Sequence, residues 1–326
     1  MKNANLFFRY LHKECGNTAK ATVNYGKIST VGDIIMQTMK RIDLHMHTTV
    51  SDGTDSLEEI LSNVREAGLT LFSVTDHDSI KAGIRIPPLM KEIPLEQRTP
   101  FIRGVEFSCK DELGKYHILG YGYNPAVPGI AEVVFKGHAL RMKKTRARLD
   151  FLKERFGFTF PEEEIHELLA KDNPGKPHIA KLMIQYGYAK DIKEAINEYI
   201  NKKEFENVHV HPEEAIDGIL RSGGIPILAH PSYGDGDDLI LGEEMDWRLQ
   251  RLMEFGVQGV EAYYSGFTPK IQEEVLALAD KYDLYVTAGS DYHGGNKMVA
   301  LGWTNLEDMI EAPEGLMRFL DDVEII

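Results

Sequence analysis

The chain contains few cysteines, and they lie far apart. Cys15 and Cys109 are the only two among 326 residues, and they form no CxxC pair. The sequence therefore supports neither a disulfide framework nor a thiolate zinc site. Any bound metal would have to be held by histidine, aspartate and glutamate.

Long apolar runs are also missing. No segment approaches the roughly 18–20 apolar residues that span a bilayer, and the N-terminal segment lacks the apolar stretch of a secretory signal. We therefore expect a cytoplasmic protein that has no membrane partner. Hydrophobic residues make up 43% of the chain and charged residues 27%, which is typical of a globular protein with one large core or two smaller ones.

Positive charge is in short supply. The chain has 51 acidic residues against 37 lysines and arginines, and its formal net charge is -14. This balance disfavours binding of duplex nucleic acid through a broad basic face. A small phosphorylated substrate is still compatible with it, because bound divalent cations would make one pocket locally attractive to phosphate.

Apolar, β-branched segments recur along the chain, and helical patterns follow several of them. We expect strands at Arg41–His47, Leu69–Asp78, Phe101–Ser108, Tyr116–Tyr123, Gly224–His230, Val257–Tyr263 and Leu284–His293. Ser56 and Glu59 predict a capping box at the start of the first helix, and Gly68 predicts its end. Strands that alternate with helices favour an α/β fold in which a parallel sheet closes, or nearly closes, into a barrel. The site of such a barrel lies at the C-terminal strand ends.

Two regions depart from this alternation. Residues 1–38 have weak periodicity and are predicted to be an N-terminal extension. Residues 126–205 read as helical and are predicted to be an inserted substrate-binding subdomain, so that residues 39–125 and 206–326 form the barrel. The expected helices of the insertion are Ala131–Phe156, Glu162–Leu169, His178–Tyr186 and Lys190–Lys203. The insertion carries a basic stretch from Arg141 to Arg148, which is either a solvated helix face or a phosphate-binding surface.

Side chains that bind divalent metals gather near the ends of the expected strands. They are His45, His47, Asp52, His77, Glu106, His117, His230, Asp291 and His293. A single histidine at a strand end is more often structural than a ligand. A whole set of them would be a costly way to build a core, because buried polar groups need partners. Nitrogen and oxygen ligands suit manganese, zinc or iron, among which the sequence does not choose.

Several motifs occur together and in order between residues 41 and 293. They are Asp43-Leu44-His45-Met46-His47, Ser51-Asp52-Gly53, Thr75-Asp76-His77-Asp78, Gly104-Val105-Glu106, His117-Ile118-Leu119-Gly120, Ala229-His230-Pro231 and Gly289-Ser290-Asp291-Tyr292-His293. This pattern resembles the polymerase-and-histidinol-phosphatase (PHP) family. Within that family it is similar to the branch that hydrolyses nucleoside 3',5'-bisphosphates and trims short 5'-phosphorylated oligonucleotides, since that branch also carries a helical insertion after the His-Ile-Leu-Gly motif.

The resemblance implies a distorted seven-stranded TIM-like barrel with three divalent ions. It places the first ion on His45, His47, Glu106 and Asp291, the second on Glu106, His117 and His230, and the third on Asp52, His77 and His293. A hydroxide bridging the first two ions would attack phosphorus, and Asp52, His77, Glu106, Asp291 and His293 are expected to serve catalysis through these ions. The resemblance also implies that Lys143, Arg146, Arg148 and His178 bind the substrate phosphate.

Several roles stay open. The leaving group could take its proton with help from the third ion or from His178, His209 or His211. Asp76 and Asp78 are expected to orient neighbouring groups or to cap a helix; Glu261 has no assigned role, and Ser108 either contacts phosphate or simply ends its strand. The expected partners are a small phosphorylated nucleotide and short single-stranded RNA, whereas the oligomeric state is not predicted. The rival functions are a phosphatase for another small monoester such as histidinol phosphate, and a non-catalytic module.

Overall fold

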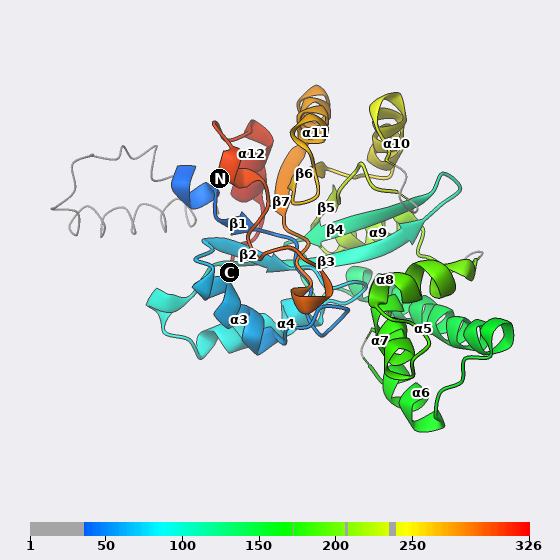
Figure 1. Ribbon diagram of the computed structural model, residues 1–326. Helices are drawn as coiled ribbons and strands as arrows, with labels where there is room; N and C mark the ends of the chain where they lie inside the picture. Colours follow the sequence, from blue (N-terminus) through cyan, green and yellow to red (C-terminus); the bar gives the residue numbers. More distant parts are fainter. Residues whose placement is uncertain (1–35, 172, 206–207, 235–238) are drawn as a thin grey trace.

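The structure, a computed structural model, describes residues 36–171, 173–205, 208–234 and 239–326 (Figure 1). Nearly all of the predicted N-terminal extension thus lies outside the described residues. Seven strands form one sheet in which the spatial order follows the sequence order. They are β1 (Ile42–Asp43), β2 (Leu71–Val74), β3 (Phe101–Lys110), β4 (Lys115–Tyr121), β5 (Ile225–Leu228), β6 (Gly259–Tyr264) and β7 (Tyr285–Gly289).

The sheet closes between its first and last strands. Backbone hydrogen bonds run from Leu44 N to Ala288 O at 2.9 Å and from Asp291 N to His45 O at 2.7 Å. The predicted seven-stranded α/β barrel is therefore confirmed. The strand β1 is much shorter than the expected Arg41–His47, because beyond Asp43 the chain makes only scattered backbone contacts, with β7 and with the segments that follow β2 and β7.

One strand runs against the others. β4 pairs antiparallel with both β3 and β5, whereas the other pairs in the sheet are parallel. The expectation of an all-parallel sheet is wrong here, because residues 111–114 are too few for a crossover helix and can only form a hairpin. The reversal brings the start of β4, which carries His117, to the barrel end where the parallel strands finish.

Helices surround the barrel. They are α3 (Leu57–Glu66), α4 (Lys81–Lys91), α5 (Pro128–Phe156), α6 (Glu162–Leu169), α7 (Lys176–Gln185), α8 (Ile192–Glu194), α9 (Pro212–Arg221), α10 (Gly242–Glu254), α11 (Pro269–Lys281) and α12 (Glu314–Asp322), with short 3-10 turns at 95–97, 200–202, 294–296 and 306–308 and a π turn at 195–199. The predicted capping box of α3 is present: Glu59 N donates to Ser56 Oγ, and Ser56 N donates to Glu59 Oε2. None of the helices in the described ranges is long and apolar enough to cross a bilayer.

The helices from α5 to α8 group together on one side of the barrel (Figure 1). They enclose an apolar cluster of their own that includes Leu152, Ile179 and Met183 and is distinct from the barrel core around Phe107 and Tyr121. The insertion is helical as expected, except that the segment predicted as one helix over 190–203 is a single α-helical turn followed by π and 3-10 turns. The subdomain boundaries at residues 126 and 205 stay a prediction.

Candidate metal centre

The barrel brings the nine predicted metal ligands together. Three groups form, and within each group the nitrogen and oxygen ligand atoms lie within 4.8 Å of one another. The groups are His45, His47 and Asp291; Glu106, His117 and His230; and His47, Asp52, His77 and His293. His47 belongs to two groups because its Nε2 faces Asp291 at 3.3 Å while its Nδ1 faces Asp52 at 3.8 Å.

Glu106 lies at the centre of the site. Its Oε2 is 3.3 Å from His45 Nε2 and 3.0 Å from His77 Nδ1, whereas its Oε1 is 2.8 Å from His117 Nδ1 and 3.4 Å from His230 Nε2. Burial would raise the pKa of Glu106, but the surrounding histidines, His117 and His77 first among them, hold it well below its usual range. One carboxylate thus faces two groups of nitrogen ligands with different oxygens, as a bridging ligand must.

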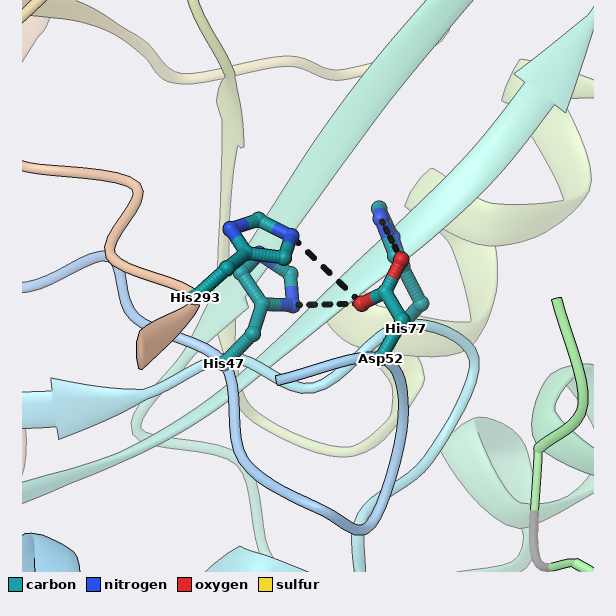
Figure 2. Close-up of side chains that lie close together, drawn as sticks. All are labelled: His47, Asp52, His77 and His293. Carbon is teal, nitrogen blue, oxygen red and sulfur yellow. Dashed lines mark ion pairs between the residues drawn. The ribbon is translucent and has the colours of Figure 1, made fainter. Parts of the chain in front are cut away.

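Asp52 lies at the centre of the group that it forms with His47, His77 and His293. Figure 2 shows its carboxylate between His293 and His47 on one side and His77 on the other. Oδ1 lies 3.4 Å from His293 Nε2, and Oδ2 lies 4.0 Å from His77 Nε2. Neither separation is a good hydrogen bond, so the four side chains surround a common point rather than bonding to one another.

Buried polar atoms without hydrogen bonds test whether this site fits a metal. They are His45 Nε2, His47 Nε2, His77 Nδ1, Asp52 Oδ1 and Glu106 Oε2. Such atoms are costly to bury unless a ligand satisfies them, and all of them are electron-pair donors that lie among like donors. Imidazole and carboxylate donors are those of manganese, zinc and iron sites, so these residues fit divalent metal ions.

Asp76 fixes the loop that carries Asp52. Its carboxylate accepts hydrogen bonds from Thr48 N at 2.8 Å, Thr48 Oγ1 at 2.8 Å and Ser51 Oγ at 2.7 Å. It therefore orients neighbouring groups, as one of the open alternatives expected. Asp78 does not cap a helix; its Oδ2 accepts from Arg141 Nε at 3.0 Å.

Glu261 has a role that the sequence did not disclose. Its Oε1 lies 2.9 Å from His45 Nδ1, and its Oε2 accepts the backbone N–H of His230 at 2.9 Å. Because a carboxylate can only accept, the proton of His45 must sit on Nδ1, which leaves Nε2 free to bind a cation. The only sign of this role in the sequence was an acidic residue on a strand that lies two strands away from the His45 motif.

Gly289 makes the contact between Glu261 and His45 feasible. A Cβ at this position would lie 2.2 Å from His45 Cβ and 2.4 Å from Glu261 Oε1. His230, whose N–H points to Glu261, has a φ of 26°, and Asp291 has a φ of 57°. Such positive values are strained for residues other than glycine and cluster at functional sites.

Asp291 has two further partners. Tyr264 donates its hydroxyl to Asp291 Oδ2 at 2.9 Å, and Lys297 forms an ion pair with the same oxygen. Asp291 Oδ1 is left to face His45 and His47. The two carboxylate oxygens are thus divided between the protein and the candidate metal position.

The basic stretch of α5 divides between two faces of the helix. Arg141 and Lys144 are buried, with 9% and 8% of their surface exposed, whereas Lys143 and Arg146 are exposed. Arg148 lies on the inner face, seven residues after Arg141, and its buried Nε makes no hydrogen bond. Lys143 and Arg146 thus lie on the exposed face of α5, and their contact with the substrate phosphate stays a prediction; spacing of i, i+3 and i+7 was the signal for the inner face.

The inner face of α5 adjoins the metal centre. Arg141 Nη2 donates to Ser108 Oγ at 3.1 Å. Ser108 follows Glu106 by two residues on the same face of β3 and pairs with His117 across the hairpin. Burial, reinforced by the positive charge of Arg141, lowers the pKa of Lys144 to about 7. We call Arg141, Lys144 and Arg148 the basic cluster.

The three histidines weighed as proton donors lie in different surroundings. His178 Nδ1 accepts the Gly175 N–H at 3.0 Å, and burial lowers its pKa to about 4 despite the charge of Asp52. His209 lies near Lys144 and Arg148, and burial lowers its pKa to about 3. His211 caps α9 by accepting from Glu213 N at 3.3 Å and belongs to a separate side-chain group with Asp111 and Glu112.

Known proteins resemble this chain along most of its length. A phosphoribosyl 1,2-cyclic phosphate 1,2-diphosphodiesterase from Eggerthella lenta is 29% identical, over 77% of this chain and 94% of that protein. A 5'-3' exoribonuclease from Haemophilus influenzae is 27% identical over 82% and 93%. A 3',5'-nucleoside bisphosphate phosphatase from Chromobacterium violaceum is 26% identical over 78% and 88%.

Solved structures agree with this picture. An amidohydrolase from Chromobacterium violaceum superposes with a TM-score of 0.70 at 23% identity, covering 84% of this chain and 98% of its own, and it shows a shared fold. A candidate metal-dependent phosphoesterase from Bifidobacterium adolescentis gives 0.69 at 25% identity, covering 82% and 94%. The PHP domain profile matches residues 43–216, which is more than half of the chain. The chain therefore belongs to the PHP domain family and is a metal-dependent hydrolase of phosphoric esters.

Proposed function

We propose that this phosphoesterase removes the 3'-phosphate of nucleoside 3',5'-bisphosphates and also acts on short 5'-phosphorylated oligonucleotides. The observation that carries the proposal is the basic cluster, which lies beside the metal centre but contributes no metal ligand. A phosphate held at the metal centre needs no second cationic site. The cluster sets three cations against the single carboxylate of Asp78, and this excess of positive charge favours a second phosphate on the same substrate.

The proposed ion positions follow the three groups of side chains. One ion would be held by His45, His47, Glu106 and Asp291, a second by Glu106, His117 and His230, and a third by Asp52, His77 and His293. Bound divalent ions supply a water of lowered pKa and neutralise the charge that develops on the phosphate. Manganese, zinc and iron all suit these donors.

The protein's own side chains would hold the rest of the substrate. The guanidinium of Arg141, fixed by Asp78 and Ser108, and the amine of Lys144 would bind the 5'-phosphate, with Arg148 offering its unpaired Nε. His178 is neutral near pH 7 and accepts at Nδ1, so its proton sits on Nε2. That N–H can donate a hydrogen bond to the scissile phosphate or to the leaving oxygen.

The relatives support a nucleotide or ribose phosphate substrate, because their names specify a nucleoside bisphosphate, RNA and a phosphoribosyl cyclic phosphate. Histidinol phosphate has a single phosphate and would leave the basic cluster without a ligand. We therefore keep the bisphosphate as the proposed substrate over the simple monoester.

A comparison of two substrates tests this proposal. Phosphate release should be measured with manganese on adenosine 3',5'-bisphosphate and on adenosine 3'-monophosphate, which differs only by the 5'-phosphate. Two charge-assisted contacts of about 1.5 kcal/mol each predict a kcat/KM about 100-fold higher for the bisphosphate. Histidinol phosphate and phosphoribosyl 1,2-cyclic phosphate serve as competing substrates. Equal rates on the two adenosine compounds, or faster hydrolysis of either competitor, would contradict the proposed substrate.

A further inference from the structure

A groove of about 400 Å³ lies beside the metal centre, between the barrel and the inserted helices. One wall is the loop that carries Asp52 and contributes Thr49, Gly53 and Thr54; the other wall comes from α6, α7 and Lys171 between them. We call it the α6–α7 groove. Its volume lies within the range of about 300–1,000 Å³ that is usual for small-molecule sites.

The groove and the basic cluster adjoin each other at Gly175, the residue that leads into α7. A Cβ on Gly175 would be 3.7 Å from Arg141 Nη1 and 4.0 Å from His178 Nδ1. Arg141 belongs to the basic cluster, whereas His178 lines the groove. The groove therefore begins where the basic cluster ends, and Gly53 in its wall directly follows the candidate ligand Asp52.

This arrangement decides what can reach the groove. In a bisphosphate that places one phosphate in the basic cluster and the other at the metal centre, the nucleoside lies between these two positions. Only a substrate that continues past the scissile phosphate extends further. The groove offers such a substrate an apolar floor of Leu168 and Leu182, which are 4% and 6% exposed, and the amines of Lys171 and Lys181.

We propose that the α6–α7 groove binds the nucleotide on the 3' side of the scissile phosphate in a 5'-phosphorylated oligonucleotide, an inference that rests on the proposed function. Leu168 and Leu182 would contact its base, and Lys181 and Lys171 its next phosphate. Water adds its hydroxyl to phosphorus, the bond from phosphorus to the 3' oxygen breaks, and that oxygen takes the proton. The remaining strand carries a new 5'-phosphate, which the basic cluster can bind in the next cycle.

Acidic side chains limit the length of strand that the groove accepts. Glu162, Glu163 and Glu164 form the first turn of α6, and Glu164 and Glu167 line the groove. Gln185 Nε2 holds the Glu164 carboxylate at 2.9 Å. Phosphates beyond the first would meet this negative charge, so the groove suits short oligonucleotides better than long ones.

The test compares Lys181→Glu with wild type and with Lys153→Glu, a matched exposed lysine in the last turn of α5 that does not line the groove. Lys181→Glu removes one lysine–phosphate contact and puts a negative charge in its place, so KM for a 5'-phosphorylated adenylate dinucleotide should rise about five- to tenfold. KM for adenosine 3',5'-bisphosphate should stay within twofold, which also reports that the variant is folded. The control should change neither value, and Lys171→Glu should add to the effect of Lys181→Glu.

The outcomes separate this inference from the proposed function. A wild-type protein that hydrolyses the bisphosphate but not the dinucleotide overturns the groove assignment and the oligonucleotide part of the proposed function, while the bisphosphatase activity stands. An unchanged KM for the dinucleotide in Lys181→Glu, or equal changes for both substrates, overturns the groove assignment alone. No hydrolysis of either substrate overturns the proposed function. With the wild type, a trinucleotide should be cleaved faster than a 12-nucleotide strand, and the reverse order would refute the acidic limit on length.

Discussion

Replacing Glu261 by glutamine should alter which nitrogen of His45 carries the proton. The carboxylate now accepts two hydrogen bonds of 2.9 Å, from His45 Nδ1 and from His230 N. A carboxamide has one oxygen, so when it serves the backbone N–H its amino group faces His45 Nδ1. The ring must then accept at Nδ1 and hold its proton on Nε2, the atom that lies 3.3 Å from Glu106 Oε2.

A protonated Nε2 cannot bind a metal, so the substitution should weaken the ion expected between His45 and Glu106. Partners behind metal-binding histidines are worth about 10–100-fold in metal affinity, or roughly 1.4–2.8 kcal/mol. Competitive titration of manganese against a chromophoric chelator measures this loss directly. Long-range proton–nitrogen NMR of the metal-free protein reads which nitrogen of His45 is protonated, independently of activity.

Asp43→Asn provides the matched control. Asp43 is also fully buried beneath the site, where it accepts from Ser290 Oγ at 2.6 Å and from the backbone N–H groups of Ser290 and His45. It contacts the His45 main chain rather than the ring, so its loss should lower stability and leave the Nδ1 proton in place. If Glu261→Gln binds manganese within twofold of wild type and keeps the Nδ1 proton, the positioning role of Glu261 is refuted.

Three other perturbations give measurable results. Lys144→Met should raise the free energy of unfolding by about 1–3 kcal/mol at pH 6. Burial lowers the pKa of Lys144 to about 7, far below its unfolded value, so this gain in stability should shrink as pH rises from 7 toward 10. Urea unfolding of both proteins at pH 6 and pH 9 checks this. Arg141→Ala leaves the Asp78 carboxylate buried and unpaired, so it should cost about 3–5 kcal/mol of stability and raise KM for the bisphosphate. Arg146 is exposed, and Arg146→Ala should change stability by less than about 0.5 kcal/mol. Chelation should abolish phosphate release and lower the thermal midpoint, and manganese at 100 times its Kd should restore about 2.7 kcal/mol.

The candidate ligands were predictable because each lies close to the end of a short apolar segment. Histidine and carboxylate side chains at such positions can be recognised even where the direction of the strand is predicted wrongly. His117 illustrates this: its strand runs opposite to the expected direction, yet the hairpin still delivers it to Glu106 at 2.8 Å. Glu261 could not be predicted in the same way, because its partner His45 directly follows β1, two strands away around the closed barrel, and that proximity depends on closure.

The inner face of α5 could not be predicted, for a different reason. Five cations within eight residues point in all directions around a helix, and local sequence does not determine which of them turn inward. Tertiary packing decides. A Cβ on Gly137 would lie 3.2 Å from Asp78, so this glycine lets α5 approach the loop after β2 closely. Arg141, one turn later on the same face, is thereby turned toward Asp78, and Lys143 and Arg146 are turned outward.

That contact links the basic cluster to the candidate metal centre. Asp78, which holds Arg141, directly follows the candidate ligand His77, and Asn173 from the insertion donates to the carbonyl oxygen of His77. The insertion thus contacts the segment around the candidate ligand His77 in two places, through a buried ion pair to Asp78 and a side-chain hydrogen bond to the His77 carbonyl oxygen. Because Arg141 also lies in the basic cluster, a phosphate bound there as proposed would contact the group that fixes Asp78. The contacts that position His77 would then also set the distance between the two proposed phosphate positions, and the spacing of the substrate's phosphates would have to match it.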